Sequence, residues 1–517
     1  MSTIKFFKRV ALIACSAILL FSCDKKDEPN NWYDDGDEVI TKGPDMAIDS
    51  DVIRVNNLLY QITGDSSCEL ISYYESYDEN WNYKTYCSTL PYPIFDIPSE
   101  VSLNGKKYSV ESIRLKKSYY LSYDSYEYVN IPINIDNVTF VNIPSSVLSI
   151  NSFELTPNTL IVGANVRRVG DLYATKIFWL PNTKPSGYNN SHASIAYASS
   201  SYGSGVEVYP HLSSMFIVDG IVYIMTSPSD RTCDIVDVKG DVNSSLNITG
   251  EVTNENITFT IGNINSYSFY ECKSINSLSI AKIASIGNYA FSGSNNMKSL
   301  VLSEIGIIGN YCFNNCGFSK VEIPNTVSKI GYGAFRNCEN LGEIRFLDGE
   351  NRLTIEYKSN SSSYDIFENT NLQKLYIGRD LYYSTSGYSP FYRLDTLKEV
   401  EIHQGETEIS NNMFYGCIAL NSVIIGDDIT KIGSKAFSGC SAMKSFKFGS
   451  QLKSIGSDAF SDCTALVSFT SEALTPPTCG SQALDDINKW ECTLYVPNES
   501  IELYKEAPQW KDFLKIE

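Results

Sequence analysis

Cysteine is the residue type whose spacing most suggests chemistry, and the 517-residue chain contains 14. Six of them stand three positions after a regularly spaced phenylalanine, at Cys272, Cys316, Cys338, Cys417, Cys440 and Cys463. A structural zinc site needs cysteines that cluster as C-x-x-C pairs, whereas these occur once in each repeat of the chain. We therefore predict that they are small buried hydrophobic side chains and that the chain holds no metal.

Four other cysteines lie outside this series. Cys479 with Cys492, and Cys68 with Cys87, could each form a disulfide if the protein is exported to an oxidising compartment. Pairing cannot be deduced from sequence, so the free-thiol alternative stays open for both pairs.

The remaining chemistry-bearing residues give no sign of a catalytic centre. The three histidines, His192, His211 and His403, are scattered along the chain without ligand-like spacing. Sixty acidic residues are present, but no motif distinguishes any pair of them. The formal net charge of -19 disfavours nucleic acid as a partner. We predict that the protein is not an enzyme and uses no cofactor.

A repeat organises the second half of the chain. The segment from Asp428 to Ala473 contains two near copies, shifted by 23 residues at every matching position. The anchoring phenylalanines recur at steps of 22 to 32 residues, at Phe269, Phe291, Phe313, Phe335, Phe367, Phe391, Phe414, Phe437 and Phe460. A period in the low twenties that carries apolar residues in an L-x-x-L-x-L-like run is typical of leucine-rich repeats.

The spacing within one repeat predicts how it packs. Apolar residues follow most of these phenylalanines at nine and eleven positions, as Val423 and Ile425 follow Phe414. Residues two apart on a strand point to the same side, so both enter the core while their neighbours face outward. The phenylalanine is expected on a turn across the core from that strand. The fold class predicted is a β-rich α/β solenoid, a horseshoe of short parallel strands.

Weaker repeats and other elements divide the rest of the chain. Residues 49–210 are predicted to hold a header and degenerate leucine-rich repeats, and residues 211–265 a second header. Residues 266–475 form the array and residues 476–517 a C-terminal cap, where the period breaks. Each header is expected to contain strands joined by tight turns, as Asn104-Gly105 indicates.

The N-terminus predicts export. Residues 1–22 combine Lys5, Lys8 and Arg9 with an apolar run too short to cross a membrane, which is typical of a signal peptide. The box that ends in Cys23 resembles that of bacterial lipoproteins, in which the cysteine is acylated. Residues 23–48 are polar and acidic, so we expect a flexible tether. Together these features predict a protein that is lipid-anchored in the outer membrane, at the cell surface.

The pattern I-x-x-I-G-x-x-A-F-x-x-C-x-x-L-x-x-I-x-I-P resembles the BspA-like leucine-rich repeat family. One repeat shows it with Val327, Ile330, Gly331, Ala334, Phe335, Cys338, Leu341, Ile344 and Phe346. The resemblance covers residues 260 to 515 strongly and residues 50 to 260 weakly. It implies a bacterial surface protein that mediates adhesion or protein–protein interaction and is not an enzyme.

A charged belt is predicted in the middle of the concave sheet. Its outward residues, a candidate partner-binding face, are Lys320, Glu322, Glu343, Arg345, Lys374, Tyr376, Glu399 and Glu401. In the alternative interpretation these charges only pair with one another along the ladder, because Lys320, Glu343, Lys374 and Glu399 alternate in sign.

Two further functions are kept as alternatives. Tyrosines crowd the N-terminal region, at Tyr73, Tyr74, Tyr77, Tyr83, Tyr86, Tyr119, Tyr120, Tyr123, Tyr126 and Tyr128, and exposed aromatic rings can stack on sugars. These residues would make the protein a glycan-binding module, although tyrosine is also an ordinary strand residue. The other alternative is a structural envelope protein without a soluble ligand.

Overall fold

The computed structural model describes residues 38–40, 44–71, 73–77, 83–87, 94–116, 118–120, 128–130, 138, 140–198, 202, 206–208, 214–356, 366–383, 389–403 and 407–517. The chain separates into two compact units, Met1–Met215 and Phe216–Glu517. The predicted signal peptide, Cys23 and the first part of the tether lie outside the described residues. No helix in the described part of the chain is long and apolar enough to span a membrane.

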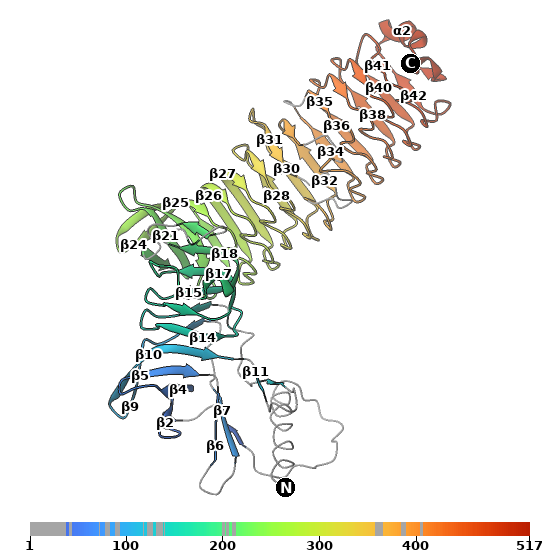
Figure 1. The fold of residues 1–517 in the computed structure, drawn as a ribbon. Helices are drawn as coiled ribbons and strands as arrows, with labels where there is room; N and C mark the ends of the chain where they lie inside the picture. The colour runs from blue at the N-terminus through green and yellow to red at the C-terminus, as the bar shows by residue number, and fades with distance from the viewer. Residues whose placement is uncertain are drawn as a thin grey trace, which may run out of the picture. The chain divides into compact units, whose positions relative to one another are not determined.

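The first unit is built from β-sheets (Figure 1). One sheet contains β2 (Met46–Ala47), β3 (Val52–Val55), β4 (Leu58–Ile62), β5 (Ser67–Ile71), β9 (Glu100–Leu103), β10 (Lys106–Leu115), β14 (Ser149–Phe153) and β16 (Arg168–Val169). A second, entirely parallel sheet contains β8 (Ile94–Asp96), β13 (Phe140–Asn142), β15 (Thr159–Val162), β17 (Leu172–Trp179), β18 (Ser191–Ala198) and β19 (Val206–Val208). Both sheets contribute to one hydrophobic core, which includes Ile113, Val141 and Trp179.

The turn at Asn104-Gly105 joins β9 and β10, which pair antiparallel. Asn104 and Gly105 both have positive φ, of 52° and 82°, which a tight hairpin turn requires. After this hairpin, β10, β14 and β16 are parallel neighbours, as expected for stacked repeats.

Part of the segment predicted to be a tether is folded. β1 (Glu38–Ile40) pairs in parallel with β7 (Tyr83–Cys87), which also pairs antiparallel with β6 (Tyr73–Tyr77). β2 pairs with β3. Val39 and Ile40 are β-branched and suit a strand, whereas the average composition of residues 23–48 conceals them. A separate antiparallel pair consists of β11 (Ser118–Tyr120) and β12 (Tyr128–Asn130).

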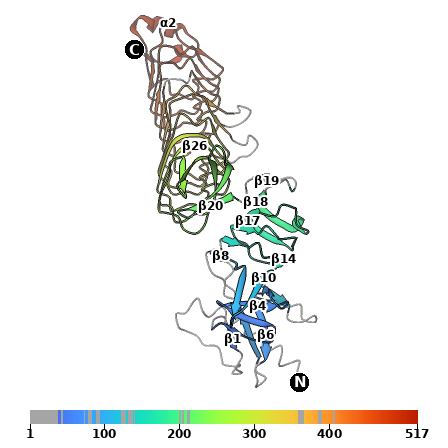
Figure 2. The same cartoon turned by 90° about the vertical axis from the view of Figure 1, so that its left-hand side faces the viewer.

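The second unit begins with antiparallel pairs and continues as a parallel stack. β20 (Met215–Val218) precedes β21 (Ile221–Ser227), which pairs antiparallel with β22 (Thr232–Val238), as β24 (Glu251–Asn254) does with β25 (Ile257–Ile264). β23 (Ser245–Ile248), β26 (Ser277–Ile286) and β27 (Ser299–Ile308) then stack in parallel. In the view turned by 90°, the rungs of the second unit overlap as successive turns of one coil (Figure 2).

Beyond β27 and as far as β41, each rung has two separate strands, which form two ribbons. The first ribbon has the predicted strands β28 (Lys320–Ile323), β30 (Glu343–Phe346), β32 (Lys374–Ile377), β34 (Glu399–Ile402), β36 (Ser422–Ile425), β38 (Ser445–Phe448), β40 (Ser468–Ser471) and β42 (Thr493–Tyr495). It ends with β43 (Lys515–Ile516), which was not predicted. The second ribbon has β29 (Lys329–Ile330), β31 (Leu353–Ile355), β33 (Leu381–Tyr382), β35 (Glu408–Ile409), β37 (Lys431–Ile432), β39 (Ser454–Ile455) and β41 (Thr478–Cys479). The parallel-strand solenoid is confirmed.

The first ribbon is interrupted twice. β27 and β28 share no ladder pairs, and neither do β36 and β38, whereas the second ribbon stays paired beside both interruptions. At the first interruption the interval from Phe313 to the inward residue Val321 is eight residues, one fewer than from Phe291 to Leu300. This difference does not by itself account for the interruption, because it also separates β28 from β30, which pair at all four positions.

The nine repeat phenylalanines form one unbroken ladder through the core. Neighbouring rings stack with centroids between 4.7 and 6.2 Å apart. All nine are buried in the same hydrophobic cluster. Each ring therefore packs on the equivalent ring of the next rung, which is how a repeat that is too small to bury its own face becomes stable.

The α-helical content is much lower than the predicted α/β class implies. The described residues contain one α-helix, α2 (Ile501–Glu506), which follows the last rungs (Figure 1). The turns carry the phenylalanines in place of helices, because backbone positions such as Tyr289, Asn337 and Lys435 adopt left-handed φ values of 56°, 58° and 57° that end any helix.

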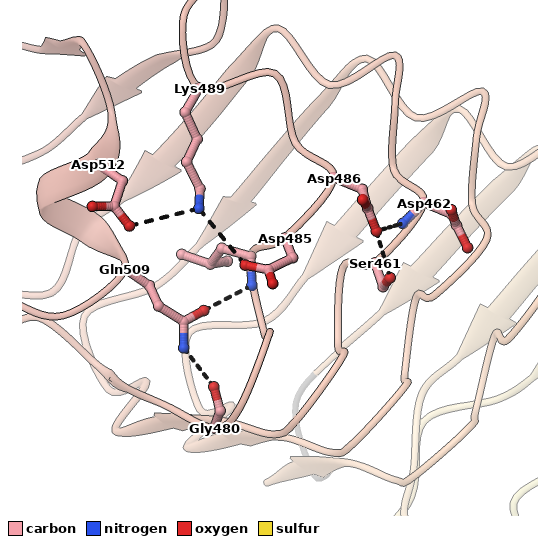
Figure 3. A network of polar contacts seen from close by, with 9 residues as sticks. Ser461, Asp462, Gly480, Asp485, Asp486, Lys489, Gln509 and Asp512 are labelled. Carbon is pink, nitrogen blue, oxygen red and sulfur yellow. Dashed lines mark hydrogen bonds and ion pairs between the residues drawn. The ribbon is translucent and has the colours of Figure 1, made fainter.

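The C-terminal segment closes the stack with polar contacts (Figure 3). The Gln509 side chain donates to the carbonyl of Gly480 at 2.5 Å and accepts from the Leu484 amide at 3.1 Å. Lys489 lies between Asp485 and Asp512, at 3.9 and 3.8 Å. Next to them the buried Trp510 indole donates to the carbonyl of Pro477 at 2.8 Å. These contacts tie the segment after the repeats to the last rungs.

Candidate functional site

The candidate site lies on the outward positions of β28, β30, β32, β34 and β36, which we call the charged face. In strand order its two columns are Lys320, Glu343, Lys374, Glu399 and Ser422, and Glu322, Arg345, Tyr376, Glu401 and Ile424. The alternate residues of these strands, such as Leu375 and Val400, are buried in the core. Alternation along each strand therefore presents both columns on one surface.

The first column contains ion pairs between neighbouring rungs. Lys320 lies 3.3 Å from Glu343 and 3.2 Å from Glu322 on its own strand. Lys374 lies 2.7 Å from Glu399. The adjacent carboxylates raise the pKa of both lysines through hydrogen bonds and charge attraction. Lys320 with Glu343, and Lys374 with Glu399, therefore pair along the ladder, as the alternative interpretation predicted.

The second column is organised around Tyr376. The Arg345 guanidinium lies over the Tyr376 ring, 3.9 Å from its centroid. The Tyr376 hydroxyl donates to Asp348 at 2.7 Å. Burial, followed by this hydrogen bond, raises the pKa of Tyr376 to about 12. Tyr376 was predicted to be part of the exposed face, but it is buried, because Arg345 covers its ring.

Glu401 lies on the other side of Tyr376. Its carboxylate is 2.6 Å from His403 Nε2, and the His403 ring lies 5.2 Å from the Tyr376 ring. Histidine 403 gave no functional signal in the sequence, and neither did Asp348. Both residues contact Tyr376, and only the three-dimensional pairing of rungs brings them beside it.

A pocket of about 280 Å³ opens on this surface. Six of the eight predicted residues line it: Glu343, Arg345, Lys374, Tyr376, Glu399 and Glu401. Ser422 and the exposed Ile424 also line it. The other two predicted residues, Lys320 and Glu322, line a second pocket of about 290 Å³ at the interruption between β27 and β28. The face predicted from the sequence is therefore hollowed in two places.

The repeat cysteines are buried free thiols, as predicted. Five of them donate from Sγ to the carbonyl of the phenylalanine one rung earlier, as Cys463 does to Phe437 at 3.3 Å. Cys479 and Cys492 are also free thiols, so the structure does not contain that candidate disulfide. Cys68 is a buried thiol, and the Cys87 side chain lies outside the described residues.

Two further predictions concern a metal site and the N-terminal tyrosines. Within the described ranges, no group of three or more histidine, cysteine or acidic side chains could hold a metal ion. The tyrosine side chains of the predicted glycan platform lie outside the described residues, so the platform stays a prediction. These are Tyr73, Tyr74, Tyr77, Tyr83, Tyr86, Tyr119, Tyr120, Tyr123, Tyr126 and Tyr128.

The parallel ribbons, the phenylalanine ladder and the outward charged face define a leucine-rich repeat protein. Residues 262–385 and 360–487 match the family described as BspA type leucine rich repeat region, 6 copies. This region therefore carries BspA-type leucine-rich repeats, as the sequence resemblance predicted. No curated protein matches the sequence.

Several solved structures are similar to this chain. A leucine-rich repeat protein of T. pallidum is 17% identical with a TM-score of 0.29, over 44% of this chain and 90% of its own. A leucine-rich cell surface protein of Faecalibacterium prausnitzii is 16% identical with a TM-score of 0.25, over 81% and 94%. The pneumococcal vaccine antigen PcpA is 14% identical with a TM-score of 0.27, over 90% and 98%.

Proposed function

We propose that this protein is an exported bacterial lipoprotein that binds a protein partner on the charged face of its second unit. Leucine-rich repeat regions serve as interaction surfaces, and the outward positions of stacked strands offer a partner a broad, rigid platform. The observation that carries the proposal is the pocket of about 280 Å³, which six of the predicted residues line.

The competing structural role explains only part of this face. Pairing along the ladder accounts for Lys320 with Glu343 and for Lys374 with Glu399. It does not account for Arg345, which has no ion pair with a carboxylate in the described part of the chain and lies against an aromatic ring. A cation that lines this pocket and forms no ion pair with its carboxylates favours an interaction surface over simple charge neutralisation.

The proposed lipid anchor and cellular location are argued from the N-terminal signal sequence. The basic start, the apolar run and Cys23 support acylation of that cysteine, and the acidic residues that follow support a spacer from the membrane. We propose attachment to the outer membrane with the second unit at the cell surface.

The first experiment measures protease accessibility on intact cells, with a periplasmic protein as the control. Loss of the protein from intact cells, with the control protected, supports surface exposure. Protection until the envelope is broken overturns it and favours a structural envelope role. The anchor is tested separately by Cys23→Ala, which should abolish metabolic labelling with a fatty acid; retained labelling contradicts acylation at Cys23.

A further inference from the structure

On the charged face, Arg345 and Glu401 are the two charged side chains without a lysine, arginine, aspartate or glutamate ion-pair partner in the described part of the chain. Lys320 is shared between Glu322 and Glu343, and Lys374 is paired with Glu399. Arg345 contacts Tyr376, and Glu401 contacts the imidazole of His403. Arg345 and Glu401 stand in the same column, on either side of Tyr376.

Arg345 is prepared to bind a carboxylate. Its guanidinium carbon lies 3.9 Å from the centre of the Tyr376 ring, and the hydroxyl of that ring is bonded to Asp348. A planar guanidinium offers N–H donors along its edge, in a geometry that matches two carboxylate oxygens. Because the ring already restrains the side chain, less conformational entropy is lost when a ligand binds.

Glu401 offers a carboxylate for a cation. One of its oxygens contacts His403 Nε2 at 2.6 Å, and the other has no side-chain partner in the described part of the chain. The side chain remains 40% exposed, so a partner can reach it. Ile424, the next residue of this column, is 57% exposed and adds an apolar contact.

Resting on the proposed function, we infer that the partner presents an extended peptide segment with an acidic side chain for Arg345 and a basic side chain for Glu401. The two residues are two rungs apart, which corresponds to about 10 Å at the usual strand separation. Residues three apart on an extended chain span about the same distance. The segment therefore reads acid-x-x-base along the column, with an apolar residue beyond the base for Ile424.

The test pans a random peptide phage library on the purified full chain and measures affinities of the enriched peptides. Arg345→Ala and Glu401→Gln are the test variants. The double variant of Lys431→Gln with Glu408→Gln is the matched control, since it removes an exposed ion pair of the second ribbon that does not line the pocket. Ile424→Arg, at an exposed position, obstructs the pocket and reports on the proposed binding face itself.

The expected peptides carry an acidic and a basic residue at this spacing. They should bind Arg345→Ala and Glu401→Gln at least about tenfold more weakly, and the control within about twofold. Arg345→Glu should recover affinity for peptides whose acidic residue is replaced by lysine. Peptides that Ile424→Arg blocks but that ignore Arg345 and Glu401 overturn this inference and leave the proposed binding face standing. If no peptide is enriched, or if Ile424→Arg has no effect, both proposals fail.

Discussion

The ring of Phe437 stacks on the ring of Phe460, with centroids 5.4 Å apart and 18° between their planes. Phe437 touches Phe414 in the same way on its other side, at 5.5 Å. A phenylalanine in the interior of this ladder therefore supports two rungs besides its own.

Phe437→Ala should lower the free energy of unfolding by about 3 to 5 kcal/mol, because it leaves a cavity between two rungs. Urea unfolding followed by circular dichroism measures the change. Tyr382→Ala is the matched control, since this aromatic ring is 54% exposed and its loss should cost far less. Equal effects of the two substitutions would contradict the role of the ladder.

Alkaline pH should destabilise the second unit through its buried thiols. Burial raises the pKa of Cys463 from 9.0 to about 12, and Cys417 and Cys338 behave alike. Unfolded cysteines release their protons first as pH rises, so this contribution is complete below about pH 9 and is lost between about 9 and 12. Denaturant unfolding at a series of pH values measures the slope.

Cys463→Ser is the control for this pH dependence. Serine does not titrate in this range, and Ser294 already occupies the equivalent place in an earlier rung, where it donates to the Phe269 carbonyl. The variant should fold and show a shallower decline of stability above pH 9. An unchanged slope would assign the alkaline effect to other groups, such as the buried tyrosines.

Arg379 holds the turn after β28 in place from two rungs away. Its buried guanidinium donates to the carbonyls of Pro324, Asn325 and Val327 at 2.8 to 2.9 Å. Arg379→Met should destabilise the unit by about 3 kcal/mol or more, because three carbonyls lose charged donors. Differential scanning calorimetry measures the loss. Arg352→Met is the control, since that arginine side chain is 62% exposed, and a similar loss for both would contradict the staple.

Gln509→Glu tests the closure of the last rungs. The substitution keeps the size of the side chain but removes the donor to the Gly480 carbonyl, and it places a negative charge beside a carbonyl oxygen. We expect a loss of about 1 to 3 kcal/mol, together with faster hydrogen exchange confined to the rungs that precede α2. Leu503→Ala on α2, which is 50% exposed, serves as the control. Exchange that accelerates uniformly along the array would contradict a local closure.

The regular part of the fold was predictable because stacking of the rungs determines the spacing of apolar residues in each repeat. Phe414, Val423 and Ile425 occupy turn and strand positions that stacking requires, and the same intervals recur in almost every rung. The second ribbon was not predicted, since strands of two residues such as Lys431–Ile432 are too short to show an alternating pattern. Stacking stabilises them, and stacking is not a local property.

The sequence predicted which residues form the charged face, but only some of the contacts that these residues make. Alternating signs predicted the pairs of Lys320 and Lys374 with their neighbours. The burial of Tyr376 depends on Arg345 from the preceding rung and on Asp348 from a loop. Arg379 likewise reaches a turn more than 50 residues earlier in the chain. Contacts across inserted loops follow from three-dimensional register, which residue types alone do not specify.

The two interruptions of the first ribbon have a mechanical consequence. Hydrogen bonds between rungs run along the axis of the stack, so a pull between the two ends of the array loads them directly. Between β27 and β28, and between β36 and β38, ladder bonds exist only in the second ribbon. Between β33 and β35 the second ribbon is broken in turn, and ladder bonds exist only in the first ribbon. Tension should therefore open the array first at these three seams, which divide it into blocks that extend one after another and limit the force transmitted to whatever the charged face holds.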